Sequence, residues 1–290
     1  MKIIECPRDA MQGLSYFVDT QLKIDYLNSL LQVGFDTLDF GSFVSAKAIP
    51  QMQDTADVLA GLDWEKHPHT KLLAIVANLR GAAQAVEFAG ITYIGFPLAI
   101  SETFQKRNTN KTIAEALEEV KAMQDLCLQY QKNLVVYISM GFGNPYGDPF
   151  HPDIVLDFVA KLDSIGIRII PLADTVGTAE PELIHTIFKE LIPAYPHIEF
   201  GAHFHALPQQ RLPKLQAAYQ AGCRRFDAAL KGFGGCPMAK DDLVGNIATE
   251  TLVEFLQTIQ NLPPQLNLSA LGASLRWADK VFSPHSSTLV

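Results

Sequence analysis

Short apolar runs alternate along the chain with longer segments of helical pattern. Eight runs have the length of a buried strand, and they span Lys2–Cys6, Thr37–Phe40, Lys71–Ala77, Tyr93–Pro97, Leu134–Ser139, Ile167–Ala173, Ile198–Phe204 and Arg225–Ala228. Apolar residues recur with helical spacing between them, over Thr20–Leu31, Ile113–Gln129, Asp153–Leu162, Pro181–Leu191 and Gln209–Gln220. Strand–helix alternation favours parallel strands joined by right-handed crossovers. Eight such units in 290 residues predict a closed (β/α)8 TIM barrel.

The alternative architecture is an open, doubly wound sheet. No GxGxxG motif follows the first apolar run, which disfavours it. We therefore expect residues 1–290 to form a single barrel domain. From about residue 252 to 290 the pattern predicts a helical extension, interrupted at Pro263 and Pro264.

Composition narrows the class of protein. Hydrophobic residues make up 48% and charged residues 19% of the chain, which argues against disorder. The net charge of −8 disfavours a nucleic-acid partner. No apolar run reaches the roughly 20 residues of a membrane helix, and no secretory leader is visible at Met1. The four scattered cysteines lack a CxxC pair, so a reducing, cytoplasmic location is expected. Barrels often form homodimers, although nothing in the sequence identifies an interface.

Polar residues gather where the apolar runs end. A TIM barrel places its active site at the carboxyl ends of its strands, so these residues are the candidates for chemistry: Arg8, Asp9, Asp39, Ser42, Asn78, Ser139, Asp174, His203, His205 and Asp227.

The sharpest local feature is His203-Phe204-His205. Residues i and i+2 of a strand point to the same face, so both imidazoles would project into the barrel mouth at a separation suited to one metal ion. Asp9 would come from the first strand, which neighbours the eighth in a closed barrel. The alternative is a pair of solvated or core-bonded histidines.

Three other features have two interpretations each. Arg8 and Asp9 would either reach the site or form a surface ion pair. Cys236 follows the glycine-rich segment 232–235, which is typical of a mobile lid or of a plain turn with a bystander thiol. Asn246 would offer its amide oxygen to a metal, or cap a helix.

Taken together, these segments resemble the 3-hydroxy-3-methylglutaryl-CoA lyase family. The similar segments follow the family's order over nearly the whole chain: Pro7–Gln12 (PRDAMQ), Ser42–Met52 (SFVSAKAIPQM), Asn78–Gly81 (NLRG), Ser101–Asn108 (SETFQKRN), Asp174–Gly177 (DTVG), His203–His205 (HFH), Gly232–Pro237 (GFGGCP) and Gly245–Glu250 (GNIATE). Each motif is weak alone, whereas the ordered set is specific.

The resemblance implies a divalent metal held by Asp9, His203, His205 and Asn246. Two imidazoles, one carboxylate and one amide oxygen suit Mg or Mn, with Zn as a further possibility. The resemblance also implies an acyl-CoA substrate whose acyl pocket would be lined by Gln12, Asp39, Ser42 and Asp174. Arg8 would stabilise an enolate oxygen, and Cys236 would lie on a loop that closes over the substrate. Asp9 or His203 would handle the hydroxyl proton. The implied reaction is the retro-Claisen cleavage of a 3-hydroxy-3-methylglutaryl-CoA-type thioester to acetyl-CoA and acetoacetate.

The chain departs from the family pattern near the acyl group. Ala206-Leu207-Pro208-Gln209 stands where Asp-Thr-Tyr-Gly is usual, and other departures lie at Ser15, Lys231, Met238 and Asp241-Asp242. Two other functions therefore remain open. One is a related metal-dependent aldolase or acyl transferase acting on a 2-oxo acid or another acyl-CoA, and the other is a non-catalytic binding barrel.

Overall fold

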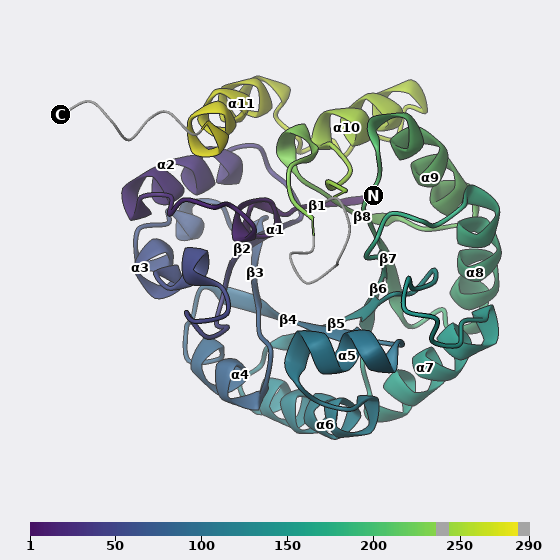
Figure 1. The fold of residues 1–290 in the computed structure, drawn as a ribbon. Coiled ribbons are helices and arrows are strands. Elements are labelled where there is room, and N and C mark those ends of the chain that lie inside the picture. The colour runs from purple at the N-terminus through teal and green to yellow at the C-terminus, as the bar shows by residue number, and fades with distance from the viewer. Residues whose placement is uncertain (236–243, 284–290) are drawn as a thin grey trace.

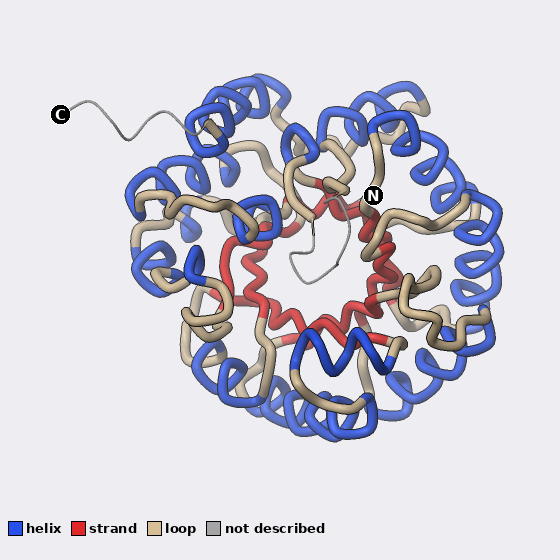
Figure 2. Tube along the Cα trace, in the orientation of Figure 1, coloured by secondary structure: helices blue, strands red, loops and turns tan. Residues whose placement is uncertain are grey.

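Eight parallel strands close into a barrel in the computed structural model, which describes residues 1–235 and 244–283. The strands follow one another around the barrel in chain order, and helices surround them (Figures 1 and 2). The strands are β1 (Lys2–Glu5), β2 (Thr37–Ser42), β3 (Lys71–Ile75), β4 (Ile91–Ala99), β5 (Asn133–Ser139), β6 (Ile169–Asp174), β7 (Glu199–Phe204) and β8 (Arg225–Ala228).

The predicted TIM barrel is confirmed, and the open sheet is wrong. The decisive contact is between the first and last strands, because Lys2 pairs with Arg225 and Ile4 with Asp227 in parallel register. This pairing leaves no free sheet edge. It also brings residues that follow β1 beside residues that follow β8, as the site requires.

Helices form the outer ring. Their bounds are α1 (Pro7–Gln12), α2 (Thr20–Leu31), α3 (Thr55–Ala60), α4 (Leu79–Ala85), α5 (Glu102–Thr109), α6 (Ile113–Gln129), α7 (Pro152–Ile165), α8 (Pro181–Ala194), α9 (Pro208–Gln220), α10 (Thr249–Thr258) and α11 (Leu268–Phe282). Short 3-10 turns lie at Pro50–Met52, Trp64–Lys66 and Leu230–Gly232. The described part of the chain contains no helix both long and apolar enough to cross a membrane.

Two helices account for the predicted C-terminal extension. The first, α10, follows β8 and completes the outer ring, so among the described residues α11 alone lies beyond the eighth strand–helix unit. This last helix packs against α2, where Asn267 donates its backbone N–H to the Val33 carbonyl at 2.8 Å. Tyr16 donates its hydroxyl to the Val281 carbonyl at 2.9 Å.

The segment after β1 differs from the strand end expected for it. Pro7–Gln12 is a short helix, α1, with Pro7 in its first turn. Proline suits that position because the first N–H groups of a helix have no partner within it. The consequence is functional, since side chains three and four residues apart on a helix lie on one face.

Candidate active site

A cavity of about 150 Å³ opens at the carboxyl ends of the strands. Its polar side carries Arg8, Asp9 and Gln12 from α1, Asp39 from β2, and His203 and His205 from β7 and its end. Its other side is apolar, with Val44, Ala48, Ile49, Ile75, Val76, Ala77, Pro97 and Phe104. The site therefore combines a cluster of charges with a wall suited to carbon-rich parts of a ligand.

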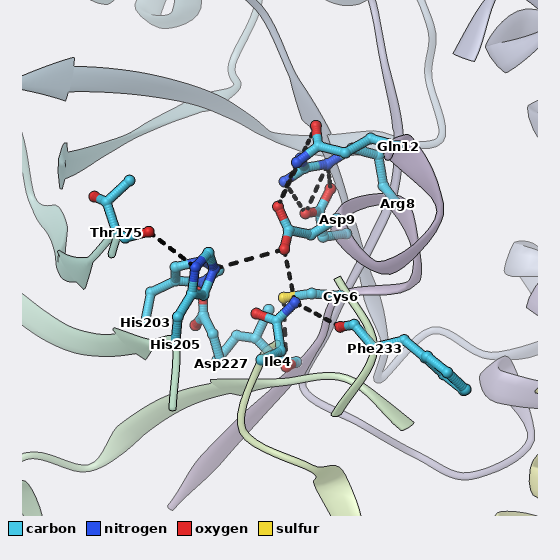
Figure 3. A network of polar contacts seen from close by, with 12 residues as sticks. Ile4, Cys6, Arg8, Asp9, Gln12, Thr175, His203, His205, Asp227 and Phe233 are labelled. Atoms are coloured by element: carbon cyan, nitrogen blue, oxygen red, sulfur yellow. Dashed lines mark hydrogen bonds and ion pairs between the residues drawn. The ribbon is translucent and has the colours of Figure 1, made fainter. Parts of the chain in front are cut away.

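The short helix α1 presents three polar side chains as one unit (Figure 3). The Arg8 guanidinium donates to Gln12 Oε1 at 3.0 Å, and Gln12 Nε2 donates to Asp9 Oδ1 at 2.8 Å. Arg8 Nη1 also lies 3.2 Å from Asp9 Oδ1. This closed set of hydrogen bonds fixes the orientation of the Asp9 carboxylate.

Arg8 makes its main ion pair with Asp39 of β2. Its Nη2 lies 2.5 Å from Asp39 Oδ2, and its Nε lies 3.1 and 3.2 Å from the two carboxylate oxygens. The Arg8 and Asp39 side chains are 9% and 1% exposed, so the interpretation of Arg8 as part of a surface ion pair is wrong. Charges this well buried are held in place by their partners.

The two carboxylates differ in proton affinity. Burial raises the pKa of Asp39 to about 6, against the opposing effect of Arg8. Burial also acts to raise the pKa of Asp9, but Arg8, His203 and His205 outweigh it and lower that pKa to about 2. Asp9 therefore stays ionised even in mild acid, as a metal ligand must.

Both histidine rings point into the barrel mouth, as the alternation of β7 predicts, and their centroids are 5.3 Å apart. The Nδ1 atom of each ring is hydrogen-bonded to a different acceptor. His203 Nδ1 lies 3.1 Å from Asp227 Oδ2, and His205 Nδ1 lies 3.1 Å from the Thr175 carbonyl. Because a carbonyl or carboxylate accepts only from an N–H, both contacts place the proton on Nδ1 and leave the Nε2 lone pair free.

Burial lowers the pKa of His205 to about 4. For His203, burial acts in the same direction, but the hydrogen bond to Asp227 prevails and the pKa is raised.

Asp9, His203 and His205 fit a divalent cation. One ligand atom from each lies within 4.8 Å of the others, and His205 Nε2 is 3.8 Å from Asp9 Oδ2. His205 Nε2 is buried without a hydrogen-bond partner among the described residues, an arrangement that is costly for a polar atom unless it has a ligand. Two imidazoles and a carboxylate are ligands that divalent metals accept.

Asn246 lies against the same carboxylate. Its Nδ2 donates to Asp9 Oδ2 at 2.7 Å and to the Phe233 carbonyl at 2.9 Å. The N-cap of α10 is Ala248, so the helix-cap interpretation of Asn246 is wrong. A half-turn of its amide would present the oxygen in place of the nitrogen.

Glycines after β8 allow this close approach. A Cβ on Gly234 would lie 2.4 Å from Asn246 Nδ2 and 3.1 Å from Asp9 Oδ2, and the residue has φ +111°. A side chain at this position would displace the groups at the site. The predicted catalytic residue Cys236 lies outside the described residues, as do the departures at Met238 and Asp241-Asp242.

Two predicted substrate-binding residues are not part of the cavity lining. Ser42 is buried, and its hydroxyl accepts from the Val44 N–H at 3.2 Å. Asp174 is 2% exposed, and its carboxylate is held by the ammonium group of Lys214 at 2.6 Å. It also accepts from the N–H groups of Thr178 and Ala179. Gln12 and Asp39, by contrast, do line the cavity.

The sequence assigned no role to three groups that support the site. Asp227 was visible at the end of the eighth run, but its contact with His203 required the register of β7 and β8. The Thr175 carbonyl and Lys214 left no signal, because a backbone oxygen has no sequence signature and a helical lysine is usually exposed.

Comparison with known proteins identifies the family. Residues 2–276 match the HMGL-like family. This chain belongs to the HMGL-like family. The resemblance found in its motifs and the predicted enzyme class, a carbon–carbon lyase, are thereby confirmed.

Relatives of this HMGL-like chain cover most of its length. The cytoplasmic 3-hydroxy-3-methylglutaryl-CoA lyase of Rattus norvegicus is 34% identical over 88% of this chain and 74% of its own. The solved HMG-CoA lyase of Bacillus subtilis is 31% identical, with a TM-score of 0.89 over 96% of this chain and 92% of that one. The HMG-CoA lyase of Acinetobacter baumannii, solved with coenzyme A and 3-methylmalate, is 32% identical, with a TM-score of 0.88 over 97% and 90% of the two chains.

Proposed function

We propose that this protein cleaves 3-hydroxy-3-methylglutaryl-CoA, or a thioester of the same type, to acetyl-CoA and acetoacetate. The observation that carries the proposal is the cluster of Asp9, His203 and His205 beside the buried guanidinium of Arg8. The named activity of its relatives supports the same reaction. The acyl-CoA class of substrate is supported by the relative solved with coenzyme A.

The reaction is difficult because two negative charges develop in turn. The tertiary hydroxyl must lose its proton, and breaking the C–C bond then leaves an enolate of the acetyl thioester. A divalent cation held by Asp9, His203, His205 and the amide of Asn246 would supply Lewis-acid stabilisation of substrate oxygens. The electron pair of the broken bond ends on the enolate, which takes up a proton at carbon to give acetyl-CoA.

Arg8 is suited to the enolate oxygen. Its guanidinium stays protonated, because the carboxylates of Asp39 and Asp9 outweigh burial and raise its pKa further. The same contacts fix its position before substrate arrives. A charge placed in advance where negative charge will develop is usually the largest contribution to catalysis.

The hydroxyl proton has two candidate acceptors, His203 and Asp9. A base works best when its pKa lies near the working pH. Asp9 and His203 are also proposed as ligands of the metal ion, and a His203 ring that donates from Nδ1 to Asp227 and binds the ion through Nε2 has no lone pair for a further proton. We therefore propose both residues as candidates and assign the role to neither. Cys236 remains the proposed donor to the enolate carbon.

We propose Mg²⁺ or Mn²⁺ as the ion, with Zn²⁺ as the alternative. The set of donors combines two nitrogens with two oxygens, and this mixture suits all three ions. Equilibrium dialysis against each metal, followed by metal analysis, distinguishes them.

The first experiment follows acetoacetate from 3-hydroxy-3-methylglutaryl-CoA in a coupled assay with Mg²⁺ or Mn²⁺. Asp9→Ala should abolish product, whereas Asp57→Ala, at an exposed position, should leave it unchanged. Product from the unaltered protein and from both variants would remove Asp9 from the mechanism. Metal binding without product would favour a 2-oxo acid or another acyl-CoA as substrate, and absence of both would favour a binding barrel.

We also propose a cytoplasmic location and a homodimeric state. The free, buried thiols of Cys6, Cys127 and Cys223 are compatible with a reducing compartment. Cell fractionation tests the location. Light scattering tests the dimer, and a mass close to the 31.9 kDa of one chain would contradict it.

A further inference from the structure

Lys214 on α9 carries an ammonium group buried near the site. Its side chain is 2% exposed. Its Nζ donates to Asp174 Oδ2 at 2.6 Å, to the Gly177 carbonyl at 2.9 Å and to the His205 carbonyl at 3.1 Å. A lysine has three protons to donate, so every one of them has an acceptor. With all three protons bonded, the buried ammonium group is held in one position.

The three acceptors lie on two segments at the paired ends of β6 and β7. Asp174 and Gly177 bound the turn after β6, and His205 follows the end of β7. The Asp174 carbonyl also accepts from the His205 N–H at 3.2 Å. Lys214 therefore connects the turn at residues 174–177 to the backbone of His205 from the outside.

That turn carries the group that orients the His205 ring. The Thr175 carbonyl lies between the two residues that Lys214 binds, and it accepts from His205 Nδ1. The turn also lies against the His205 backbone, because a Cβ on Gly177 would lie 3.2 Å from the His205 carbonyl oxygen. A small shift of the turn would move the Thr175 carbonyl away from the ring, and His205 Nδ1 would lose its hydrogen-bond acceptor.

We propose that Lys214 is a positioning residue for His205. It fixes the Thr175 carbonyl against the ring, which keeps the proton on Nδ1 and directs the Nε2 lone pair toward Asp9. The part of this proposal that concerns metal binding rests on the proposed function, which places an ion at Asp9, His203 and His205. It also assigns Asp174 a task other than contact with substrate, namely to hold the Lys214 ammonium group.

The test compares two buried lysines. Lys214→Met removes the ammonium group at the site. Lys23→Met is the matched control, because Lys23 is also 2% exposed and paired with an aspartate, Asp54 at 2.7 Å, on the outer helix α2. Both variants should melt at lower temperature than the unaltered protein, so thermal stability alone does not separate the roles.

Two readouts separate them. We expect the Kd for Mn²⁺, measured by calorimetry, to rise roughly 10- to 100-fold in Lys214→Met, as for other losses of support behind a metal ligand, and to stay unchanged in Lys23→Met. In metal-free protein, nitrogen-15 NMR of the histidine rings should show His205 protonated on Nδ1. That signature should be lost in Lys214→Met. The signal is assigned to His205 by its disappearance in His205→Asn.

Each outcome decides one question. Unchanged Mn²⁺ affinity and an unchanged ring signature in Lys214→Met would overturn the role of Lys214 alone. If the unaltered protein bound no Mn²⁺, the proposed metal site would fall, and the ring signature would still decide whether Lys214 sets the His205 tautomer. Should Lys214→Met not fold, the double variant Lys214→Met/Asp174→Asn removes both buried charges and is measured in its place.

Discussion

Single atoms behind the histidine rings decide which nitrogen faces the site. Asp227 accepts from His203, and the Thr175 carbonyl accepts from His205. If either acceptor were lost, the ring could turn or exchange its proton between nitrogens, and the lone pair would no longer face Asp9. The support is thus as specific as the ligands themselves.

Asp227→Ala should weaken metal binding while leaving the ligands in the sequence. We expect the Kd for Mn²⁺ to rise by roughly 10- to 100-fold, because His203 loses the acceptor for its Nδ1 proton. Calorimetric titration measures it. The matched control is Asp163→Ala, which removes an aspartate 2.8 Å from a half-exposed histidine, His197, outside the site. Equal affinity in the two variants would contradict the role of Asp227.

Arg8→Met tests the enolate hypothesis. Loss of the fixed positive charge should lower kcat by roughly 10²- to 10³-fold, the usual effect of removing one stabilising donor, with a much smaller effect on the Kd for Mn²⁺. Steady-state kinetics and a metal titration on the same sample measure both. Arg8→Lys keeps a charge without the planar fork that binds Asp39, so it should recover only part of the rate. Turnover equal to that of the unaltered protein would exclude Arg8 from the chemistry.

At the scale of elements, hydrophobic pattern predicted the strands because parallel barrel strands are buried on both faces. Arg225–Ala228 was predicted with its observed bounds, and Thr20–Leu31 likewise. The helix α1 was missed, since six residues that begin with a proline carry too little periodicity. The hydrophobic pattern also does not predict contacts between loops. The link from Lys214 to Asp174 spans 40 residues and depends on the height at which α9 packs.

The loop after β8 depends on a residue without a side chain. Gly234→Ala should lower metal affinity by at least about tenfold, because the new Cβ would lie 2.4 Å from Asn246 Nδ2 at a strained φ of +111°. Calorimetry with Mn²⁺ measures this.

Gly272→Ala is the control for the glycine substitution. Gly272 lies inside α11, and apart from neighbouring residues of that helix no atom lies within 4 Å of the added Cβ. The substitution should therefore keep the affinity and raise the stability by about 0.4–1 kcal/mol. Weakened binding in the control, or unaltered binding in Gly234→Ala, would contradict the steric argument.

At the scale of the whole molecule, the seam between the two ends of the barrel lies beside the site. Glu5 of β1 is fully buried and accepts from the Leu230 N–H at 2.8 Å and from the Thr249 hydroxyl at 2.5 Å. The first strand thereby holds both the turn after β8 and the start of α10. This long-range closure supports the proposal that the chain is a single domain, because neither end of it completes the barrel alone.

The seam makes stability depend on pH. Burial raises the pKa of Glu5 from 4.5 to about 8, against the opposing effect of its two hydrogen bonds. Between those values the folded protein holds a proton that the unfolded chain releases. The free energy of unfolding contributed by Glu5 therefore falls as pH rises from 4.5 to 8, by an amount on the order of a few kcal/mol, and is constant above.

Glu5→Gln removes this titration and keeps the shape. The amide accepts from the Leu230 N–H through its oxygen and donates to the Thr249 hydroxyl through its nitrogen, so the fold should be retained. Urea unfolding at pH 6 and pH 8.5 measures the free energy for both proteins. Other titrating groups contribute equally to each, so the difference between the proteins isolates Glu5. We expect the variant to gain stability relative to the unaltered protein as pH rises. A difference that did not change with pH would mean that Glu5 is ionised in the folded barrel throughout, and that the seam is held by a charge instead of a carboxylic acid.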